Sequence, residues 1–140
     1  MRIGLDGFPL LVPLTGVGHY TFELARALAL LAPSDEFELV APNAFPSSVL
    51  ENIRLNCPAN LRAVTAEAKS IRRRRWWAVG LPLYLRKASL DLFHGTNYEV
   101  PLWSRRRSVL TIHDLSIVLH PDTHKADLAR RARRRLPVMA

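Results

Sequence analysis

The fold is decided in residues 2–31, where the sequence reads RIGLDGFPLLVPLTGVGHYTFELARALALL. Its first five residues form a short, mainly apolar run that ends in a carboxylate at Asp6, and a loop rich in glycine and proline follows as far as Gly18. This pattern is typical of a buried strand followed by a turn region. From Val17 onward, leucines and one tyrosine repeat at helical spacing until Pro33, which predicts an amphipathic helix with a stop signal.

Strand and helix patterns alternate along the rest of the chain. Further strands are expected at residues 37–41, 61–64, 90–94 and 108–112, and helical segments at 74–88 and 127–136. This order predicts a doubly wound, mainly parallel α/β sheet of Rossmann-like type. In such sheets ligands bind beyond the carboxyl ends of the strands. The polar residues at those ends are therefore the functional candidates, namely Asp6, Asn43, His94, Asn97, His113 and Asp114.

The length and the cysteine content limit the classes of protein that fit. A chain of 140 residues allows one domain of ordinary size. The single cysteine, Cys57, excludes an intramolecular disulfide and leaves too few thiolates for a Cys-based zinc site. His120 and His124 have the spacing of helical metal ligands, but Pro121 intervenes and no third ligand is evident. We expect no bound metal and a reduced, cytoplasmic compartment. No apolar run approaches the roughly 18 residues of a membrane span.

Charge is distributed unevenly along the chain. Residues 1–68 carry four basic and seven acidic groups, residues 69–140 carry sixteen and five, and the overall net charge is +8. Arginine runs at residues 72–75, 105–107 and 130–135 supply much of this excess. Such runs indicate an anionic partner, whether nucleic acid, a phosphate-bearing substrate or an anionic membrane. The tryptophans at 76 and 77 could stack on bases or lie among lipid headgroups, although tryptophans in this position usually enter the core of the next helix. A solvated surface is the favoured interpretation of the arginines at 72–75, an anionic membrane the second and nucleic acid the third.

Two short motifs have both a functional and a structural interpretation. Gly16, Val17 and Gly18 open the first helix, where free backbone N–H groups favour a phosphate, but the glycines could equally relieve a tight turn. A dinucleotide fingerprint and a P-loop both fit badly, because the third glycine is missing and no Gly-Lys-Ser/Thr follows. His113 beside Asp114 could supply an acid–base pair, or could be a turn histidine beside a capping aspartate. Its position at a strand end favours function.

Three ordered motifs resemble the N-terminal half of family 4 glycosyltransferases, especially mannosyltransferase-like members. They are residues 2–6 with 16–21, residues 91–98 (DLFHGTNY) and residues 111–116 (TIHDLS). The family has the GT-B fold, in which two Rossmann-like domains face each other across a cleft. The resemblance implies that residues 1–140 are an incomplete N-terminal, acceptor-side domain, without the donor-binding C-terminal domain. Because the family's domain continues beyond this point, residues 108–112 are expected near an exposed edge of the sheet.

The resemblance also implies an activity. It implies a retaining transferase that moves a hexosyl group from a nucleotide sugar to a glycan or a lipid-linked acceptor, with no metal ion or other cofactor. His113 and Asp114 would be the catalytic residues beside the transferred sugar. The residues implied to contact the donor phosphates or the acceptor are Gly16, Val17, Gly18, His94, Asn97 and Tyr98. The family's usual basic residue after the glycine loop is His19 here. We expect the 140 residues alone to be inactive, because the family holds its donor chiefly with the C-terminal domain.

Two other interpretations of the sequence remain open. One is a basic, non-catalytic module for nucleic acid or another anionic partner, which predicts steeply salt-dependent binding. Nucleic acid is the less favoured partner, since no nucleic-acid-binding signature accompanies the arginine runs. The other is a flavodoxin-like nucleotide-binding protein with a phosphate or flavin at the glycine loop. Under the leading hypothesis the protein is cytoplasmic, and its basic second half makes peripheral contact with the inner face of an anionic membrane.

Overall fold

The computed structural model describes residues 1–66, 73–101 and 107–114. The expected basic helix at residues 127–136 lies outside the described residues, as do His120 and His124. The described helices and strands, in chain order, are β1 (Arg2–Asp6), η1 (Phe8–Leu10), α1 (Gly16–Leu31), β2 (Glu36–Ala41), α2 (Ser47–Asn56), β3 (Leu61–Thr65), η2 (Trp76–Gly80), α4 (Leu81–Lys87), β4 (Leu92–Gly95) and β5 (Arg107–Leu110).

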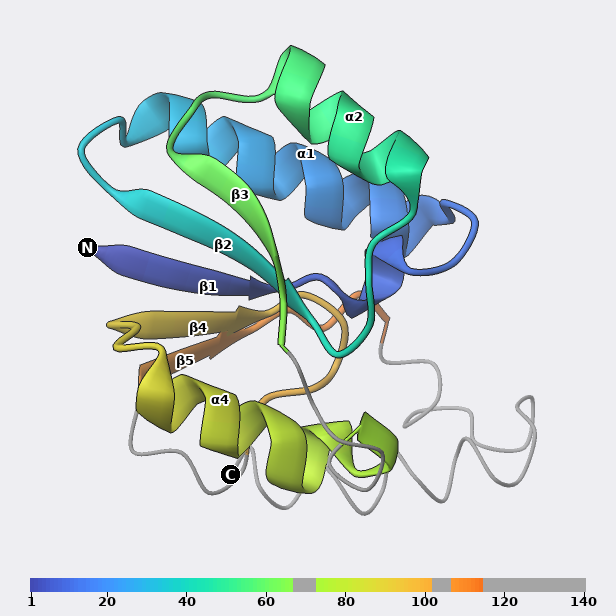
Figure 1. Ribbon diagram of the computed structural model, residues 1–140, viewed down its shortest axis with the longest axis vertical. Coiled ribbons are helices and arrows are strands. Elements are labelled where there is room, and N and C mark those ends of the chain that lie inside the picture. The colour runs from blue at the N-terminus through green and yellow to red at the C-terminus, as the bar shows by residue number, and fades with distance from the viewer. Residues whose placement is uncertain (67–72, 102–106, 115–140) are drawn as a thin grey trace.

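Five parallel strands form one sheet in the order β3-β2-β1-β4-β5. The strand β1 lies in the centre, paired with β2 on one side and β4 on the other. The strand order therefore reverses beside β1, and the strands of Figure 1 all point toward the same edge. A reversal of this kind is where doubly wound sheets place their ligands. The Rossmann-like α/β class predicted from the sequence is confirmed.

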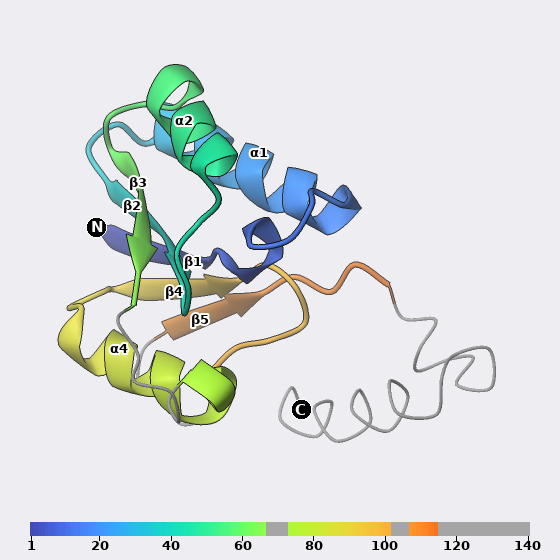
Figure 2. The same ribbon diagram turned by 45° about the vertical axis from the view of Figure 1, so that its right-hand side comes forward.

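Helices cover both faces of the sheet. In Figures 1 and 2, α1 and α2 lie on one face, and η2 and α4 lie on the other. Alternate side chains of a strand point to opposite faces, so in β2 Leu39 enters the core under α1 whereas Val40 enters the core above α4. Both are almost fully buried. Burying a side chain of this size stabilises the fold by about 1.5–3 kcal/mol, which explains why the central strands are nearly continuous apolar runs.

The helix α2 was not expected from the sequence. Only Val49 and Ile53 enter the core from this helix, whereas Leu50 and Leu55 are exposed. Its N-cap residue is Pro46, and no side chain caps the helix there. The pattern of apolar residues therefore does not mark a single face, and the usual start signals of a helix are missing.

The residue bounds of the last two described strands differ slightly from the predicted bounds. The strand β4 covers 92–95 instead of 90–94, and β5 covers 107–110 instead of 108–112. Leu90 is fully buried but precedes the strand. The N–H of Thr111 still donates to the carbonyl of Gly95 at 2.9 Å, so residues 111–114 continue past the end of β5. Among the described strands β5 is at the edge, and three of its four residues are exposed, as expected.

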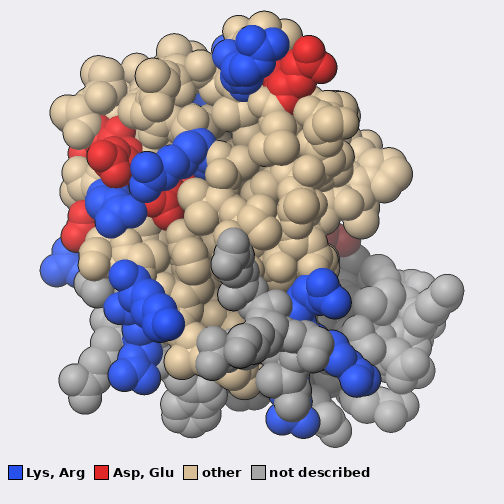
Figure 3. All heavy atoms as spheres, viewed as in Figure 1, with Lys and Arg blue, Asp and Glu red and all other residues tan. Residues whose placement is uncertain are grey.

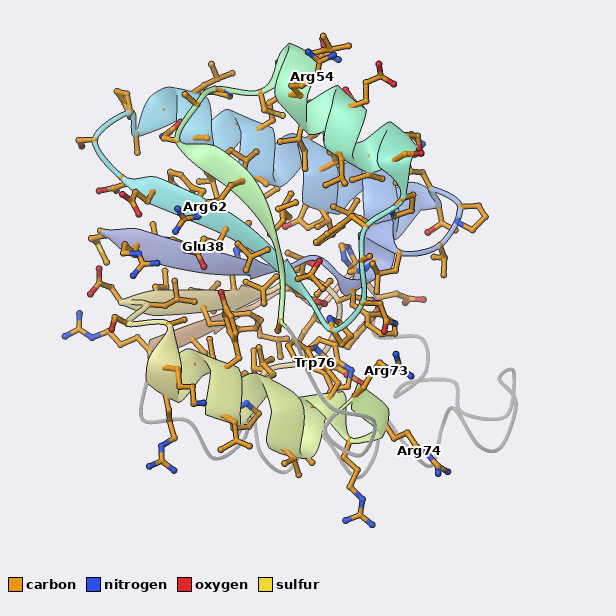
Figure 4. All side chains as sticks on the ribbon, in the orientation of Figure 1. Glu38, Arg54, Arg62, Arg73, Arg74 and Trp76 are labelled. Atoms are coloured by element: carbon orange, nitrogen blue, oxygen red, sulfur yellow. The ribbon has the colours of Figure 1, made fainter. Side chains whose placement is uncertain are left out.

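A buried carboxylate connects three strands to a helix. Glu38 of β2 accepts hydrogen bonds from Arg2 and Arg62 of the neighbouring strands and from the hydroxyl of Tyr84 of α4. Figure 4 shows Glu38 and Arg62 side by side. Burial raises the pKa of Glu38, but the three hydrogen bonds outweigh it and hold the pKa below its ordinary value. The charge of Glu38 is therefore stabilised inside the fold.

The basic second half of the sequence contributes to the surface around α4. The arginines at residues 73–75 precede η2, Arg86 and Lys87 end α4, and all five side chains are exposed. In the view of Figure 3, basic and acidic side chains are mixed over α2 and the strands, whereas the layer that contains α4 shows basic side chains alone. No helix within the described ranges is both long and apolar enough to cross a membrane.

Candidate active site at the sheet edge

The carboxyl ends of β1 and β4 are joined to α1 by buried hydroxyl groups. The Oγ1 of Thr96, which directly follows β4, donates to the backbone carbonyl of Asp6 at 3.1 Å. The Oγ1 of Thr21, in the second turn of α1, donates to Thr96 Oγ1 at 2.9 Å. All three residues are at most 1% exposed. This buried chain of hydrogen bonds fixes the start of α1 against the point where the strand order reverses.

His113 lies beside these residues, and the structure determines which of its ring nitrogens is protonated. Its Nε2 atom is 2.7 Å from the carbonyl oxygen of Thr96. Because a carbonyl oxygen only accepts, Nε2 carries the proton, and in the neutral ring Nδ1 is the nitrogen that can accept from a ligand. The ring of Tyr20 packs edge-to-face on the imidazole at 4.8 Å, and that of Tyr98 lies at 5.9 Å. The orientation of the imidazole is therefore held from three directions.

His94, the second candidate histidine, belongs to a hydrogen-bonded chain across the same edge. Its Nε2 atom is 2.8 Å from the Oγ1 of Thr111, which in turn lies 3.1 Å from the hydroxyl of Tyr20. Burial lowers the pKa of His94, so its ring is neutral near pH 7. Tyr20 thus contacts His113 with its ring, and it is linked to His94 through its hydrogen bond to Thr111.

The loop after β4 carries two further candidates, Asn97 and Tyr98. Tyr98 has a positive φ of 58°, which is uncommon for a residue with a side chain and is often found at functional sites. Its N–H donates to the carbonyl of Thr111 at 3.2 Å, and its hydroxyl donates to the backbone carbonyl of Asp114 at 3.0 Å. Tyr98 therefore ties this loop to the segment that carries His113. Asn97 is half-buried in the same loop.

The glycine loop (residues 16–18) forms the first turn of α1, as the sequence predicted. A Cβ atom built on Gly16 would meet nothing within 4 Å, whereas one on Gly18 would lie 2.9 Å from Leu14 Cδ2 and 3.2 Å from the carbonyl of Pro9. A Cβ atom at Gly18 would therefore crowd Leu14 and Pro9, whereas Gly16 leaves the backbone open. The side chain of the N-cap residue Thr15 makes no capping hydrogen bond, and the first turn holds no acidic residue. The start of α1 therefore suits an anion.

Asp6 is a buried carboxyl group at the end of β1. Its Oδ1 atom accepts from the N–H of Phe8 at 2.9 Å, and within the described part of the chain Oδ2 has no hydrogen-bond partner. Burial raises the pKa of Asp6 to about 7, against the opposing effect of the Phe8 N–H and with a further increase from the charge of Glu99. This carboxyl group is therefore able to exchange a proton near neutral pH.

The structure brings most of the predicted residues to one edge and adds others. His94, Tyr98, His113 and Asp114 are connected there by hydrogen bonds or ring contacts, next to the glycine loop. The residues that were not predicted are the hydroxyl-bearing partners Tyr20, Thr21, Thr96 and Thr111. Tyr20 is hydrogen-bonded to a residue 91 positions away in the sequence, and Thr21 to a residue 75 positions away. Local spacing could therefore not reveal these contacts. In the described ranges, no three His, Cys, Asp or Glu side chains are grouped to hold a metal ion.

Comparison of this chain with known proteins finds a curated relative. Over 143 aligned residues the chain is 29% identical to the O-antigen chain mannosyltransferase B of Escherichia coli. The alignment covers 93% of this chain but 36% of the relative, so the chain spans little more than a third of the relative's length. No family model and no solved structure matches.

Proposed function

We propose that this chain is the N-terminal, acceptor-side portion of a retaining glycosyltransferase, which moves a hexosyl group from a nucleotide sugar to a glycan or a lipid-linked acceptor. The observation that carries the proposal is the alignment of 93% of the chain with a protein named as a mannosyltransferase. The site geometry adds support, because the histidines of the resembling motifs lie among hydroxyl groups at the edge where such sheets bind ligands.

His113 has the central role in this proposal. The backbone carbonyl of Thr96 accepts a hydrogen bond from the Nε2–H of His113, and Tyr20 packs against the ring. Nδ1 is therefore presented to a ligand in a fixed direction. A sugar hydroxyl is a suitable partner for Nδ1, and a fixed imidazole loses little entropy when it binds. Asp114 follows His113 in the chain and is anchored through its backbone by Tyr98.

The remaining candidates divide between the two substrates. The open start of α1 is proposed to face the donor diphosphate, since its N–H groups and helix dipole favour negative charge. The neutral ring of His94, with Asn97 and Tyr98, is proposed to line the acceptor side. No metal ion or other cofactor is included in the proposal. A cytoplasmic location at the inner face of a membrane, where lipid-linked acceptors would be found, is part of the same proposal.

The alternative of a nucleic-acid-binding module has less support. Stacking on bases requires exposed aromatic faces. Trp76 is only 3% exposed, and Trp77 is half-buried with its ring in contact with Phe8. The tryptophans after the arginine run therefore belong mainly to the core beside α4, as such tryptophans usually do.

A binding and turnover experiment tests the proposal. The 140-residue chain is titrated with hexose-bearing nucleotide sugars and with an α-linked mannose oligosaccharide, and release of nucleoside diphosphate is then measured with both present. We expect the oligosaccharide to bind, His113→Ala to weaken that binding, and turnover to be negligible. Failure of every saccharide to bind would reject the glycosyltransferase role. Measurable turnover would instead show that these 140 residues hold both substrates, contrary to the proposed acceptor-side role.

A further inference from the structure

Tyr20 ends a hydrogen-bonded chain at the exposed edge of the sheet. Its hydroxyl lies 3.1 Å from the Oγ1 of Thr111, and that Oγ1 lies 2.8 Å from the Nε2 of His94. His94 and Thr111 are half-buried, whereas Tyr20 is 37% exposed in the second turn of α1. The chain therefore leads from a half-buried imidazole at its inner end to a phenol hydroxyl that a ligand can reach at its outer end.

A second hydroxyl chain at the same edge shows why the exposure of Tyr20 matters. The chain from Thr21 through Thr96 to the carbonyl of Asp6 is buried along its whole length and fixes α1 against the sheet. The hydrogen bond between Tyr20 and Thr111 is exposed. Water competes for both of its hydroxyls, so its net contribution to stability is small. Stability is therefore supplied by the buried chain, and the exposed chain is available to a ligand.

The protonated nitrogen of His94 sets the direction of the exposed chain. The ring is neutral near pH 7, so one of its two nitrogens carries the proton. The chain then runs head to tail in two ways. With the proton on Nε2, His94 donates to Thr111, Thr111 donates to Tyr20, and the phenol proton is left for a ligand. With the proton on Nδ1, Tyr20 donates to Thr111, Thr111 donates to Nε2, and the phenol oxygen is left as an acceptor.

A saccharide hydroxyl suits both arrangements. It donates and accepts through one oxygen atom, as the hydroxyls of the chain do. A phosphate oxygen only accepts and would match one arrangement alone. The ring of Tyr20 also lies 4.8 Å from the ring of the exposed His113, whose Nδ1 is the proposed saccharide contact. The two side chains are therefore close enough for one saccharide to contact both.

We propose that Tyr20 binds a hydroxyl of the acceptor saccharide directly, and that Thr111 is a positioning residue that ties the donor or acceptor character of Tyr20 to the protonated nitrogen of His94. The inference rests on the proposed function. It adds Tyr20 to the residues that recognise the acceptor, and it gives the half-buried ring of His94 a way to affect acceptor binding through Thr111.

The test titrates an α-linked mannose trisaccharide into the 140-residue chain and into variants that each lack one hydroxyl. Tyr20→Phe keeps the ring that packs on His113 and should weaken binding roughly two- to tenfold, the scale of one neutral hydrogen bond. Thr111→Val should weaken binding too, but less in the Tyr20→Phe background, because the two hydroxyls act together. Thr65→Val is the matched control, since Thr65 is exposed at the end of β3, and it should leave binding unchanged.

NMR of the imidazole nitrogens separates this role from a merely structural one. Without saccharide, Thr111→Val and Tyr20→Phe should each change the ratio of the two His94 tautomers. Thr111→Ser keeps the hydroxyl and should keep the ratio. The Nε2–H of His113, which donates to the carbonyl of Thr96, should persist in every variant and shows that the edge is folded.

Unchanged trisaccharide affinity in Tyr20→Phe would overturn the contact, and an unchanged His94 tautomer ratio in Thr111→Val would overturn the positioning role. Failure of this inference is distinguishable from failure of the proposed function. In the first case His113→Ala still weakens saccharide binding while Tyr20→Phe does not. In the second case the unchanged chain binds no saccharide, and the inference fails with the function.

Discussion

The carboxyl group of Asp6 couples the stability of the fold to pH. Its pKa is about 7 in the folded chain, because burial disfavours the charged form, and near 4 when the chain is unfolded. Between these values the folded state holds a proton that the unfolded state has lost. The contribution of Asp6 is therefore most favourable below about pH 4 and is lost as the pH rises toward about 7.

Asp6→Asn should remove this dependence. The amide keeps the shape of the carboxyl group and an oxygen for the Phe8 N–H. Relative to the variant, the unchanged chain should lose at most about 1.4 kcal/mol of unfolding free energy per pH unit between about pH 4 and 7. Urea unfolding at a series of pH values measures the difference, with the exposed Glu51→Gln as control. A difference that does not vary with pH would show that Asp6 keeps an ordinary pKa.

At the scale of elements, the start of α1 combines a packing requirement with an open backbone. Gly18 has Leu14 and the carbonyl of Pro9 at close range, whereas Gly16 has open space where a side chain would lie. The two glycines of one loop therefore offer a matched comparison, in which packing and ligand binding are affected separately.

Gly18→Ala should be less stable than Gly16→Ala by up to about 1–3 kcal/mol, because its Cβ atom would crowd Leu14 and the carbonyl of Pro9. Gly16→Ala should leave stability unchanged or raise it by up to about 1 kcal/mol, since alanine restricts the unfolded chain. The same Gly16 variant should weaken binding of a nucleotide sugar, because its methyl group enters the space in front of the helix N-terminus. Thermal unfolding and equilibrium binding measure the two effects. Equal destabilisation by both substitutions would contradict the different roles assigned to the glycines.

The elements also show what the sequence could and could not predict. The strands β1 and β2 were predictable because burial on both faces makes them apolar runs. The rule for strand ends correctly grouped His94 with His113. The helix α2 was missed because its exposed leucines obscure its buried face. The hydroxyl groups of Thr21 and Thr96 were missed because their contact depends on the arrangement of distant segments, which no local pattern encodes.

At the scale of the whole molecule, Glu38 joins the strands β1, β2 and β3 to α4. Glu38→Ala leaves Arg2 and Arg62 without this carboxylate, and it should lower the unfolding free energy by roughly 2–4 kcal/mol. Part of this contribution disappears as the pH falls below about 4.5, because the pKa of Glu38 is lower in the folded state. Urea unfolding measures it. The control Glu51→Ala breaks only an exposed pair, and an equally small effect of both would contradict the role of Glu38.

The basic surface around α4 gives a second prediction for the whole molecule. If this surface attracts an anionic bilayer, each arginine contributes about 1 kcal/mol near the membrane. Replacing the three exposed arginines at residues 73–75 with glutamine should therefore weaken binding to phosphatidylserine vesicles strongly, and added salt should have the same effect. Vesicle sedimentation measures the change. The exposed Arg54→Gln, on α2, is the control, and equal binding by all variants would remove the support for membrane contact.

The most direct test of the central claim is an NMR map of saccharide binding on the 140-residue chain. An α-linked mannose oligosaccharide is added, and amide and imidazole signals are followed. We expect the largest shifts at Tyr20, His94, Thr96 and Thr111, and at His113, whose Nδ1 signal should respond while Nε2 remains protonated toward Thr96. Shifts confined to α2 and β3, or no shift at any concentration, would contradict a glycosyl-transfer site at this edge of the sheet.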